Sequence, residues 1–253
     1  MKPVEIRNCK IGEGIPKICV PIVEKTEKEI ICAAKSLTVI PADIVEWRVD
    51  WFEDVFDLDQ VKHILKQLRE VLKDTPLLFT FRTAKEGGER SIDDEYYARL
   101  NKEVAKTGYV DLIDVEIFIG DNYVKDIIGE VHACGVAVIA SNHDFNKTPK
   151  EEEIISRLCK MKEMGADISK IAVMPEDKKD VLTLLSATEK MTGLYPEHPI
   201  ITMSMAGTGV LSRICGEVFG SAVTFASAGK TSAPGQIDVH ALKQILHILH
   251  QNM

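Results

Sequence analysis

Eight short apolar runs, each rich in β-branched residues, recur along the chain at intervals of about 30 residues. Their length and composition are typical of buried β-strands. We therefore expect strands over residues 17–23, 43–49, 77–82, 110–117, 136–142, 168–174, 199–204 and 222–226.

The segments between these runs have the periodicity of amphipathic helices. One apolar stripe with helical spacing consists of Leu58, Val61, Ile64, Leu65, Leu68 and Leu72. Asp57 precedes that stripe as a candidate N-cap, and Thr148, followed by Pro149 and a run of glutamates, predicts another helix start. Gly165 follows a helical pattern, at the place of a left-handed C-cap. Residues 238–250 predict a closing helix.

Strands that alternate with helices in this way build βαβ units and a parallel sheet. Eight such units in 253 residues favour a closed (β/α)8 TIM barrel, with residues 1–253 as a single domain. A doubly wound sheet also alternates, but no G-x-G-x-x-G follows the first run, which weakens a dinucleotide-binding interpretation. The preceding segment 4–15, which contains Gly12 and Gly14, is expected to form a β-hairpin that closes the bottom of the barrel.

The composition, with 45% hydrophobic and 28% charged residues, is ordinary for a folded protein. The formal net charge of -8 argues against a nucleic-acid partner, because phosphate backbones need a basic surface. A small anionic ligand is compatible with this charge, since it responds only to the field of its pocket. No apolar run approaches the ~20 residues that span a bilayer, so no membrane association is expected.

The 6 cysteines form no C-x-x-C pair and have no histidine at zinc-finger spacing, so the sequence indicates no metal site. The first residues of the chain are charged and lack the apolar core of a secretory signal. We therefore expect reduced, mostly buried thiols and a cytoplasmic location.

Charged residues occur inside the apolar runs, and barrel enzymes place their chemistry at the strand ends. Glu46 and Arg48 are two residues apart, so both face one side of the second run. Asp114 and Glu116 share a face of the fourth run in the same way. Buried charges are costly unless they pair or bind a ligand. For Glu46 and Arg48 both interpretations stay open, whereas the two carboxylates are expected to pair with Arg48 or Arg82.

Lys170 lies in the sixth run, on the face shared with Ala172 and Met174 and opposite Ile171 and Val173. The apolar pair suits the helix side of the strand, so Lys170 is expected to point into the barrel. A lysine kept from water is converted more readily into a neutral, nucleophilic amine, which imine formation with a ketone requires. Pairing with an interior glutamate is an equally good interpretation from the residues alone. Because Lys170 lies early in its run, its long stem has to reach upward.

Other candidate residues stand at the ends of further runs. His143 directly follows the fifth run, and a histidine there is a natural general acid or base because its pKa lies near neutrality. Glu86 is followed by two glycines, in a loop that can approach a ligand closely. Arg82 offers a planar fork to a carboxylate or to paired hydroxyls. Arg213, near the helix after the seventh run, is placed to hold a substrate carboxylate.

The last two runs add apolar and uncharged polar groups. Met203 and Met205 offer a soft apolar wall, although plain core packing is the simpler interpretation. The segment 229–236 is rich in turn formers, and its Ser232 and Gln236 offer a hydroxyl and an amide to a polyol. Each signal is weak alone, and it is their joint position at strand ends that indicates a site.

These residues stand in motifs that together resemble the type I 3-dehydroquinate dehydratases of the shikimate pathway. The matching stretches follow barrel order through nearly the whole chain: Glu46-Trp-Arg48, Phe81-Arg82-Thr with Glu86-Gly-Gly, Ser141-Asn-His143-Asp-Phe145, Lys170-Ile-Ala, Met203-Ser-Met205 with Gly207, and Ser232-Ala-Pro-Gly-Gln236. The resemblance implies a TIM-barrel lyase without metal or organic cofactor, 3-dehydroquinate as the small-molecule substrate, and a cytoplasmic homodimer.

The resemblance also implies roles. Lys170 resembles the imine-forming lysine, and His143 the base that removes a proton beside the carbonyl and then helps water leave. Glu86 resembles the carboxylate near that histidine, and Arg213 the ligand of the substrate carboxylate. Pro21 stands where members often carry a small hydroxyl residue, so no contact from the first strand is expected. The groups that hold hydroxyls and fix orientation correspond to Glu46, Arg48, Arg82, Ser232 and Gln236.

Two other functions compete with this one. An aldolase would also form an imine, but it cleaves a carbon–carbon bond and usually has a phosphate site near strands seven and eight. Gly-Thr-Gly at 207–209 could mimic such a site, but Arg213 with Ser232 and Gln236 suits a carboxylate and hydroxyls better. A non-catalytic binding protein on the same fold is the third alternative, and the presence of both Lys170 and His143 argues against it.

Overall fold

The computed structural model describes residues 2–253, in which strands and helices alternate from one end to the other. The barrel strands are β3 (Lys17–Ile22), β4 (Ile44–Arg48), β5 (Leu77–Thr80), β6 (Leu112–Glu116), β7 (Ala137–Asp144), β8 (Ile168–Val173), β9 (Ile200–Ser204) and β10 (Val223–Ser227). Each strand is followed by a helix: α1 (Glu27–Leu37), α2 (Leu58–Leu72), α3 (Asp94–Ala105), α4 (Asp121–Ala133), α5 (Glu151–Glu163), α6 (Lys178–Leu194), α7 (Gly216–Phe219) and α8 (Val239–His250). All eight predicted strands are confirmed, with ends that differ by at most two residues.

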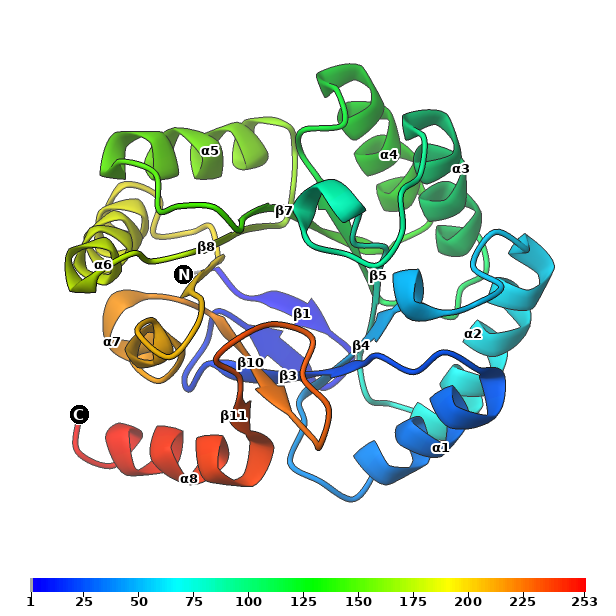
Figure 1. The fold of residues 1–253 in the computed structure, drawn as a ribbon, viewed down its shortest axis with the longest axis horizontal. Coiled ribbons are helices and arrows are strands. Elements are labelled where there is room, and N and C mark those ends of the chain that lie inside the picture. Colours follow the sequence, from blue (N-terminus) through cyan, green and yellow to red (C-terminus); the bar gives the residue numbers. More distant parts are fainter. Residues whose placement is uncertain (1) are drawn as a thin grey trace.

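The strands form a parallel sheet in the order β10-β3-β4-β5-β6-β7-β8-β9, and a short strand β11 (Ile237–Asp238) pairs with β10 at its outer edge. Between β9 and β10 the sheet closes through a single bridge from Ile200 to Ser221. There the backbone N–H of Ala222 donates to the Ile200 carbonyl (2.8 Å), and the N–H of Thr202 donates to Ser221 Oγ (3.0 Å). Figure 1 shows the strands at the centre and the helices as a ring around them. The predicted TIM barrel is confirmed.

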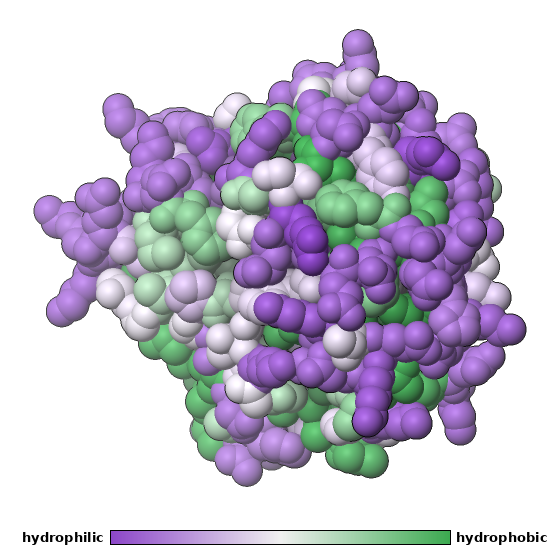
Figure 2. Space-filling model, turned by 45° about the vertical axis from the view of Figure 1, so that its right-hand side comes forward, coloured by the Kyte–Doolittle hydropathy of each residue, from purple (hydrophilic) through white to green (hydrophobic). Residues whose placement is uncertain are grey.

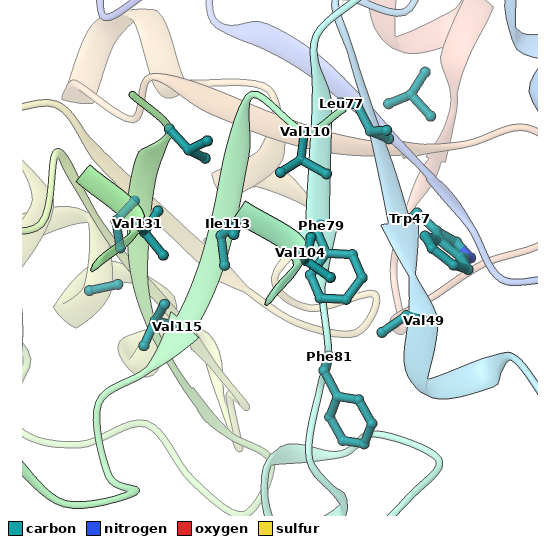
Figure 3. Close-up of a cluster of buried hydrophobic side chains, with 14 of the residues drawn as sticks. Trp47, Val49, Leu77, Phe79, Phe81, Val104, Val110, Ile113, Val115 and Val131 are labelled. Atoms are coloured by element: carbon teal, nitrogen blue, oxygen red, sulfur yellow. The ribbon is translucent and has the colours of Figure 1, made fainter. Parts of the chain in front are cut away.

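The apolar side chains form a layer between the strands and the helices, because alternate residues of each strand point outward. Trp47 illustrates this layer: it is fully buried and meets the ring of Phe79 edge to face, with 5.9 Å between the ring centroids. Figure 3 shows its members side by side along three neighbouring strands, among them Trp47, Val49, Leu77, Phe79, Phe81, Ile113 and Val115.

The inward-pointing residues form layers of different polarity. The lowest layer, at the start of the strands, is apolar and is here called the floor: Cys19, Ile44, Leu78, Leu112, Ile139, Ile168, Ile201 and Val223. Two residues further along the strands, the inward positions carry charged groups such as Glu46, Asp114 and Lys170. The last layer includes Arg48 and His143. The barrel therefore has a dry lower end and a polar upper end.

The expected hairpin closes the lower end. Strands β1 (Val4–Ile6) and β2 (Cys9–Ile11) are antiparallel, with Val4 opposite Ile11. The turn falls at residues 7–8, where Arg7 takes a left-handed φ of 50°, and both glycines of the segment follow the second strand. Ile11 is fully buried and packs in the same cluster as the floor residues.

Most predicted helix ends are confirmed, but one is wrong. Asp57 caps α2 by accepting from the N–H groups of Asp59 and Gln60, and Gly165 follows α5 with a left-handed φ of 97°. However, α5 begins at Glu151, and its N-cap residue Lys150 forms no side-chain cap. The Thr148 hydroxyl donates instead to the backbone carbonyl of Met174 (2.9 Å), so it ties the loop to the end of β8.

All cysteines in the described residues are free, but the expectation of mostly buried thiols is only partly confirmed. Cys9 and Cys19 are buried, whereas Cys32 and Cys134 are exposed. Cys32 lies in an apolar stretch, yet the buried face of α1 is formed by Ile30 and its neighbours one and two turns on, so the thiol points outward.

The surface shown in Figure 2 is mostly hydrophilic, with smaller apolar areas between the charged side chains. Within residues 2–253, no helix is both long and apolar enough to cross a membrane.

Candidate active site

The upper ends of the barrel strands surround a cavity that contains ten of the eleven predicted site residues. They are Glu46, Arg48, Arg82, His143, Lys170, Met203, Met205, Arg213, Ser232 and Gln236. Glu86, the eleventh, lies directly behind His143. The lining also includes Gly87 and Phe145, which the sequence interpretation had only as parts of motifs, and Phe225, which it missed. A wider groove lies beside α1, but none of the charged side chains that line it is buried.

Lys170 points into the barrel, as predicted, and its ammonium group is almost fully buried. Its Nζ lies 2.9 Å from Asp114 Oδ2 and 4.5 Å from the centroid of the Phe225 ring. The lysine is therefore paired, but with an aspartate rather than the expected glutamate, and it still lines the cavity. The sequence left two interpretations open, an ion-paired lysine and a lysine that faces a ligand cavity. In the structure Lys170 is both paired and on the cavity lining.

Asp114 is fully buried and receives several donors at once. Besides Lys170, Arg82 Nη2 donates to Oδ1 (2.7 Å), and so does Ser141 Oγ (2.6 Å). Burial alone would raise the pKa of this carboxyl, but the charges of Arg82 and Lys170 outweigh it and hold the pKa well below its usual range. Asp114 is thus a carboxylate at neutral pH.

Arg82 is the centre of the charge network. Its Nη1 donates to Glu116 Oε1 (2.8 Å) and to Ser141 Oγ (3.0 Å), while Nη2 holds Asp114. The prediction that Asp114 and Glu116 each pair with an arginine is confirmed, and Arg82 is the partner of both. Burial lowers the pKa of Arg82, but these carboxylates raise it more, so the net shift is well above the ordinary value. The guanidinium stays cationic and fixes the buried carboxylates.

Arg48 and Glu46 do not pair with each other. Arg48 donates through Nε and Nη2 to the two oxygens of Asp50, each at 2.8 Å. Glu46 Oε1 accepts from the Thr80 hydroxyl (2.8 Å). Asp50 is a residue that the sequence interpretation missed, although it stands two positions after Arg48. It also accepts from the backbone N–H of Arg82 (3.3 Å), so it links the ends of β4 and β5.

His143 and Glu86 are in direct contact. Glu86 Oε2 accepts from the backbone N–H of His143 (2.8 Å) and lies 3.0 Å from His143 Nδ1. Glu86 is placed by the short helix η2 (Ala84–Glu86), which ends at Gly87 with a left-handed φ of 83°. A Cβ at Gly87 would lie 2.3 Å from the Phe145 ring, and one at Gly88 would lie 1.8 Å from the Arg82 carbonyl. The two glycines are therefore needed to bring Glu86 under the histidine.

The surroundings shift both pKa values so that the histidine is neutral. Burial, reinforced by the charges of Arg82 and Lys170, lowers the pKa of His143 well below its ordinary value. Burial, and then the charge of Glu116, raises the pKa of Glu86 to about 8. When Glu86 is ionised it accepts the Nδ1–H, and the free lone pair of His143 is then on Nε2. A neutral histidine of this tautomer is a competent general base.

Arg213, in the short helix η3 (Val210–Arg213), is a buried cation without an acidic partner in the described residues. Its Nη2 donates to the Pro234 carbonyl (2.9 Å), and its Nε has no partner. Burial lowers the pKa of Arg213 to about 10, so the group is still charged at neutral pH. Its free hydrogen-bonding capacity at the cavity suits an anion.

The comparisons with known proteins agree with this geometry. Residues 18–253 match the family model described as type I 3-dehydroquinase. The chain belongs to the type I 3-dehydroquinase family. It is 56% identical to the 3-dehydroquinate dehydratase of Clostridioides difficile, over 100% of this chain and 99% of the relative, and 58% identical to that of Clostridium botulinum, over 99% and 98%. The motif resemblance, and the assignment to a family of lyases, are confirmed.

A solved structure has the same fold as this type I 3-dehydroquinase over the whole length of both chains. It is the type I 3-dehydroquinate dehydratase from Clostridium difficile with covalently modified comenic acid, which superimposes with a TM-score of 0.97. It is 56% identical and covers 100% of both chains.

In this member of the type I 3-dehydroquinase family, Ser232 and Gln236 belong to a loop beside the cavity. Gln236 Oε1 accepts from the Ser232 N–H, and Gln236 Nε2 donates to Ser232 Oγ, both at 2.9 Å. The predicted pair is thus found together. Met203 and Met205 are buried and also line the cavity, so they pack in the core and form part of the cavity wall at the same time. Among residues 2–253, no group of three or more histidine, cysteine, aspartate or glutamate side chains is arranged to hold a metal.

Proposed function

We propose that this protein is a 3-dehydroquinate dehydratase that converts 3-dehydroquinate into 3-dehydroshikimate and water through an imine on Lys170. Membership of the type I 3-dehydroquinase family supports the overall reaction. The observation that carries the covalent step is the position of the Lys170 amine, buried in a cavity with His143 and Arg213 on its lining. The covalently modified comenic acid in the solved relative is consistent with a reactive group in that protein.

The first chemical step joins the lysine to the substrate. The neutral Lys170 amine attacks the ketone carbon, and the resulting carbinolamine loses water to give a protonated imine. Asp114, 2.9 Å from Nζ, lies beside the cationic imine as a carboxylate and offsets its charge. The imine withdraws electrons from the neighbouring C–H bond, which a ketone does too weakly for histidine to act as the base.

His143 then performs the elimination. Its Nε2 removes the proton beside the imine carbon, and the electron pair forms an enamine. The enamine expels the β-hydroxyl, which leaves as water after taking the proton from His143. Glu86 stabilises the transient imidazolium at 3.0 Å from Nδ1. Hydrolysis of the conjugated imine consumes one water and releases 3-dehydroshikimate and Lys170, so the net reaction loses one water.

The remaining groups bind the substrate. Arg213 takes the carboxylate, because it is a buried cation with an unpaired Nε. The hydroxyls are held by the polar groups that remain on the lining, Glu46, Arg48, Arg82, Ser232 and Gln236. Met203 and Met205 form the apolar wall. No step requires a metal or an organic cofactor, and the resemblance implies none.

The proposal extends to the whole protein. We take residues 1–253 as a single catalytic domain of a cytoplasmic homodimer in the shikimate pathway, as the family resemblance implies. An aldolase interpretation is less well supported, since the cavity offers Arg213 with Ser232 and Gln236 for a carboxylate and hydroxyls.

Borohydride trapping tests the covalent step. Treatment with borohydride in the presence of 3-dehydroquinate or 3-dehydroshikimate should reduce the imine to a secondary amine, raise the intact mass by one ligand and inactivate the enzyme. Peptide mapping should place the adduct on Lys170. The same treatment without ligand should change nothing.

Two variants serve as controls for the trapping. Lys170→Ala should bind ligand without ever being trapped, whereas Lys230→Ala, which removes an exposed lysine of the loop beside the cavity, should be trapped like wild type. An adduct on Lys230 would show that the site assignment is wrong. Rapid turnover of 3-dehydroquinate with no adduct would replace the imine by an enolate route.

A further inference from the structure

A chain of hydrogen bonds connects the outer ring of helices to His143. Arg157, on α5, donates from Nη1 to Asn142 Oδ1 (2.7 Å). Asn142, on β7, donates from Nδ2 to Glu86 Oε1 (3.0 Å). The other oxygen of Glu86 is the one that contacts His143. The chain thus ends on the carboxylate that orients the proposed base.

The chemistry of the donors fixes the direction of this chain. A guanidinium only donates, so the amide of Asn142 has to present its oxygen to Arg157. Its NH2 group then faces Glu86, and an amide NH2 also only donates. The backbone N–H of His143 occupies the other oxygen in the same way. Both donors stabilise the negative charge of Glu86 more than they stabilise its neutral acid, so the network favours the ionised carboxylate.

Arg157 is held by several groups besides Asn142. Its Nη1 lies 3.7 Å from Asp144 Oδ2, and its Nη2 pairs with Glu153 one turn away on α5. The guanidinium lies 5.6 Å from the centroid of the Phe118 ring, and only 16% of the side chain is exposed. These contacts make Arg157 a fixed donor rather than a mobile surface charge.

The ionisation of Glu86 needs such support, because the groups around it oppose it. Burial and the charge of Glu116 disfavour the carboxylate, whereas Arg82, at 3.6 Å, favours it. His143 is faced by Arg82, Lys170 and Arg48, whose charges disfavour a second proton on the ring, and by Asp114, whose charge favours it. A protonated Glu86 could donate to Nδ1, and the imidazole would then carry its proton on Nε2, where the base has to be free.

We propose that Arg157 is a positioning residue for the reaction: through Asn142 it favours the ionised form of Glu86, keeps that carboxylate aimed at His143, and so favours the tautomer in which Nε2 is free. This inference rests on the proposed function of His143. It assigns to the helix ring a part in the chemistry, although Arg157 does not touch the substrate cavity.

The test is the pH dependence of kcat/KM for 3-dehydroquinate. Arg157→Met keeps the length of the stem but removes charge and donors, and Asn142→Leu removes the relay. Loss of the Arg157 charge, or of the hydrogen bond that Asn142 donates to Glu86, favours an extra proton on the Glu86–His143 pair, so the acid limb should move to higher pH by about one unit in both variants. At pH values well below the acid-side pKa, kcat/KM of each variant should be about tenfold lower than that of wild type, because one pKa unit is a factor of ten in proton affinity.

Lys160→Met is the matched control. Lys160 is one helical turn from Arg157, carries the same charge and lies 5.7 Å from the same Phe118 ring, but it pairs with Asp121. Its removal should leave the pH profile unchanged. At high pH all these variants should approach the wild-type rate, which a folding defect would not allow.

A Glu86→Gln background separates the possible failures. If Arg157 acts through Glu86, Arg157→Met should have no further effect there, since the coupling lies in the shared partner. A profile of Arg157→Met that superimposes on wild type, or a loss of equal size at every pH, would overturn the inference. Near-normal turnover of His143→Ala would instead overturn the proposed function, because the base would then be another group.

Discussion

Arg213 differs from the other buried cations of the molecule in what surrounds it. Arg48, Arg82 and Lys170 each have a carboxylate within hydrogen-bonding distance. Arg213 has only the Pro234 carbonyl and a methionine sulfur at 3.9 Å. A buried charge without an opposite charge costs folding free energy, and its retention at the cavity indicates a ligand that supplies the missing negative charge.

Arg213→Ala should therefore weaken substrate binding without lowering stability. Losing a charge-assisted pair in a buried setting costs about 2–5 kcal/mol of binding free energy, so KM should rise roughly thirtyfold or more. Because the arginine is desolvated without a carboxylate partner, Tm should hold or rise. Steady-state kinetics and thermal melts measure both quantities, with Arg213→Lys as the charge-conserving control. A collapse in Tm at unchanged KM would make Arg213 a structural residue.

The sequence predicted which side chains face the cavity better than it predicted their partners. Alternation within a strand was sufficient to turn Lys170 and Arg48 inward. The hydrogen-bonding partner of each inward side chain depends on strand register and on the side-chain rotamer. The hydrophobic pattern of the sequence predicts neither. The partner of Arg48, Asp50, stands just beyond the strand and was therefore not predicted. Arg157 was missed because its surface helix pattern gives no sign of its contact with Asn142.

Among the elements, the strands were predicted within two residues, since short β-branched runs that recur regularly between helical segments fit few other structures. Helix starts were less certain, because the Thr148 hydroxyl had a competing acceptor at the end of β8. The eight units predicted a closed barrel, but not the contacts through which β9 meets β10. One of these contacts uses a side chain: the N–H of Thr202 donates to the hydroxyl of Ser221. Between the other barrel strands, such an N–H donates to a backbone carbonyl.

Ser221→Ala should weaken this closure. The substitution leaves the buried N–H of Thr202 without its acceptor, which costs about 1–3 kcal/mol. We expect a lower free energy of unfolding in denaturant and faster hydrogen exchange of the Thr202 amide. Ser36→Ala is a suitable control, because this serine is exposed on α1 and bonds only within its helix. Unchanged exchange at Thr202 would show that the closure does not depend on the Ser221 side chain.

The whole molecule is built around a closed lower end and an open upper end. The hairpin β1–β2 packs beneath the floor, and the polar cavity lies above it. Stability and chemistry therefore depend on different residues along the same strands, as is typical of this fold.

Ile11→Ala tests that separation. Ile11 is fully buried against the floor, and truncating such a side chain costs about 2–5 kcal/mol. Denaturant unfolding should show this loss, while kcat and KM at a temperature well below the transition should stay near wild type. Ile248→Ala, at a position that is 60% exposed, should change neither. A large fall in kcat for Ile11→Ala without loss of folded protein would mean that the hairpin controls the cavity.

The layering of the barrel interior bears on how such a protein can diverge. A mutation in the upper layers alters which ligand is held, yet it leaves the floor and the hairpin intact, so a descendant with a changed substrate would still fold. The constraint lies at Asp114, which Lys170, Arg82 and Ser141 all contact. Substitutions at these positions would have to occur together, so we expect evolutionary change to be rapid around the rim of the cavity and slow in the layer that Asp114 occupies.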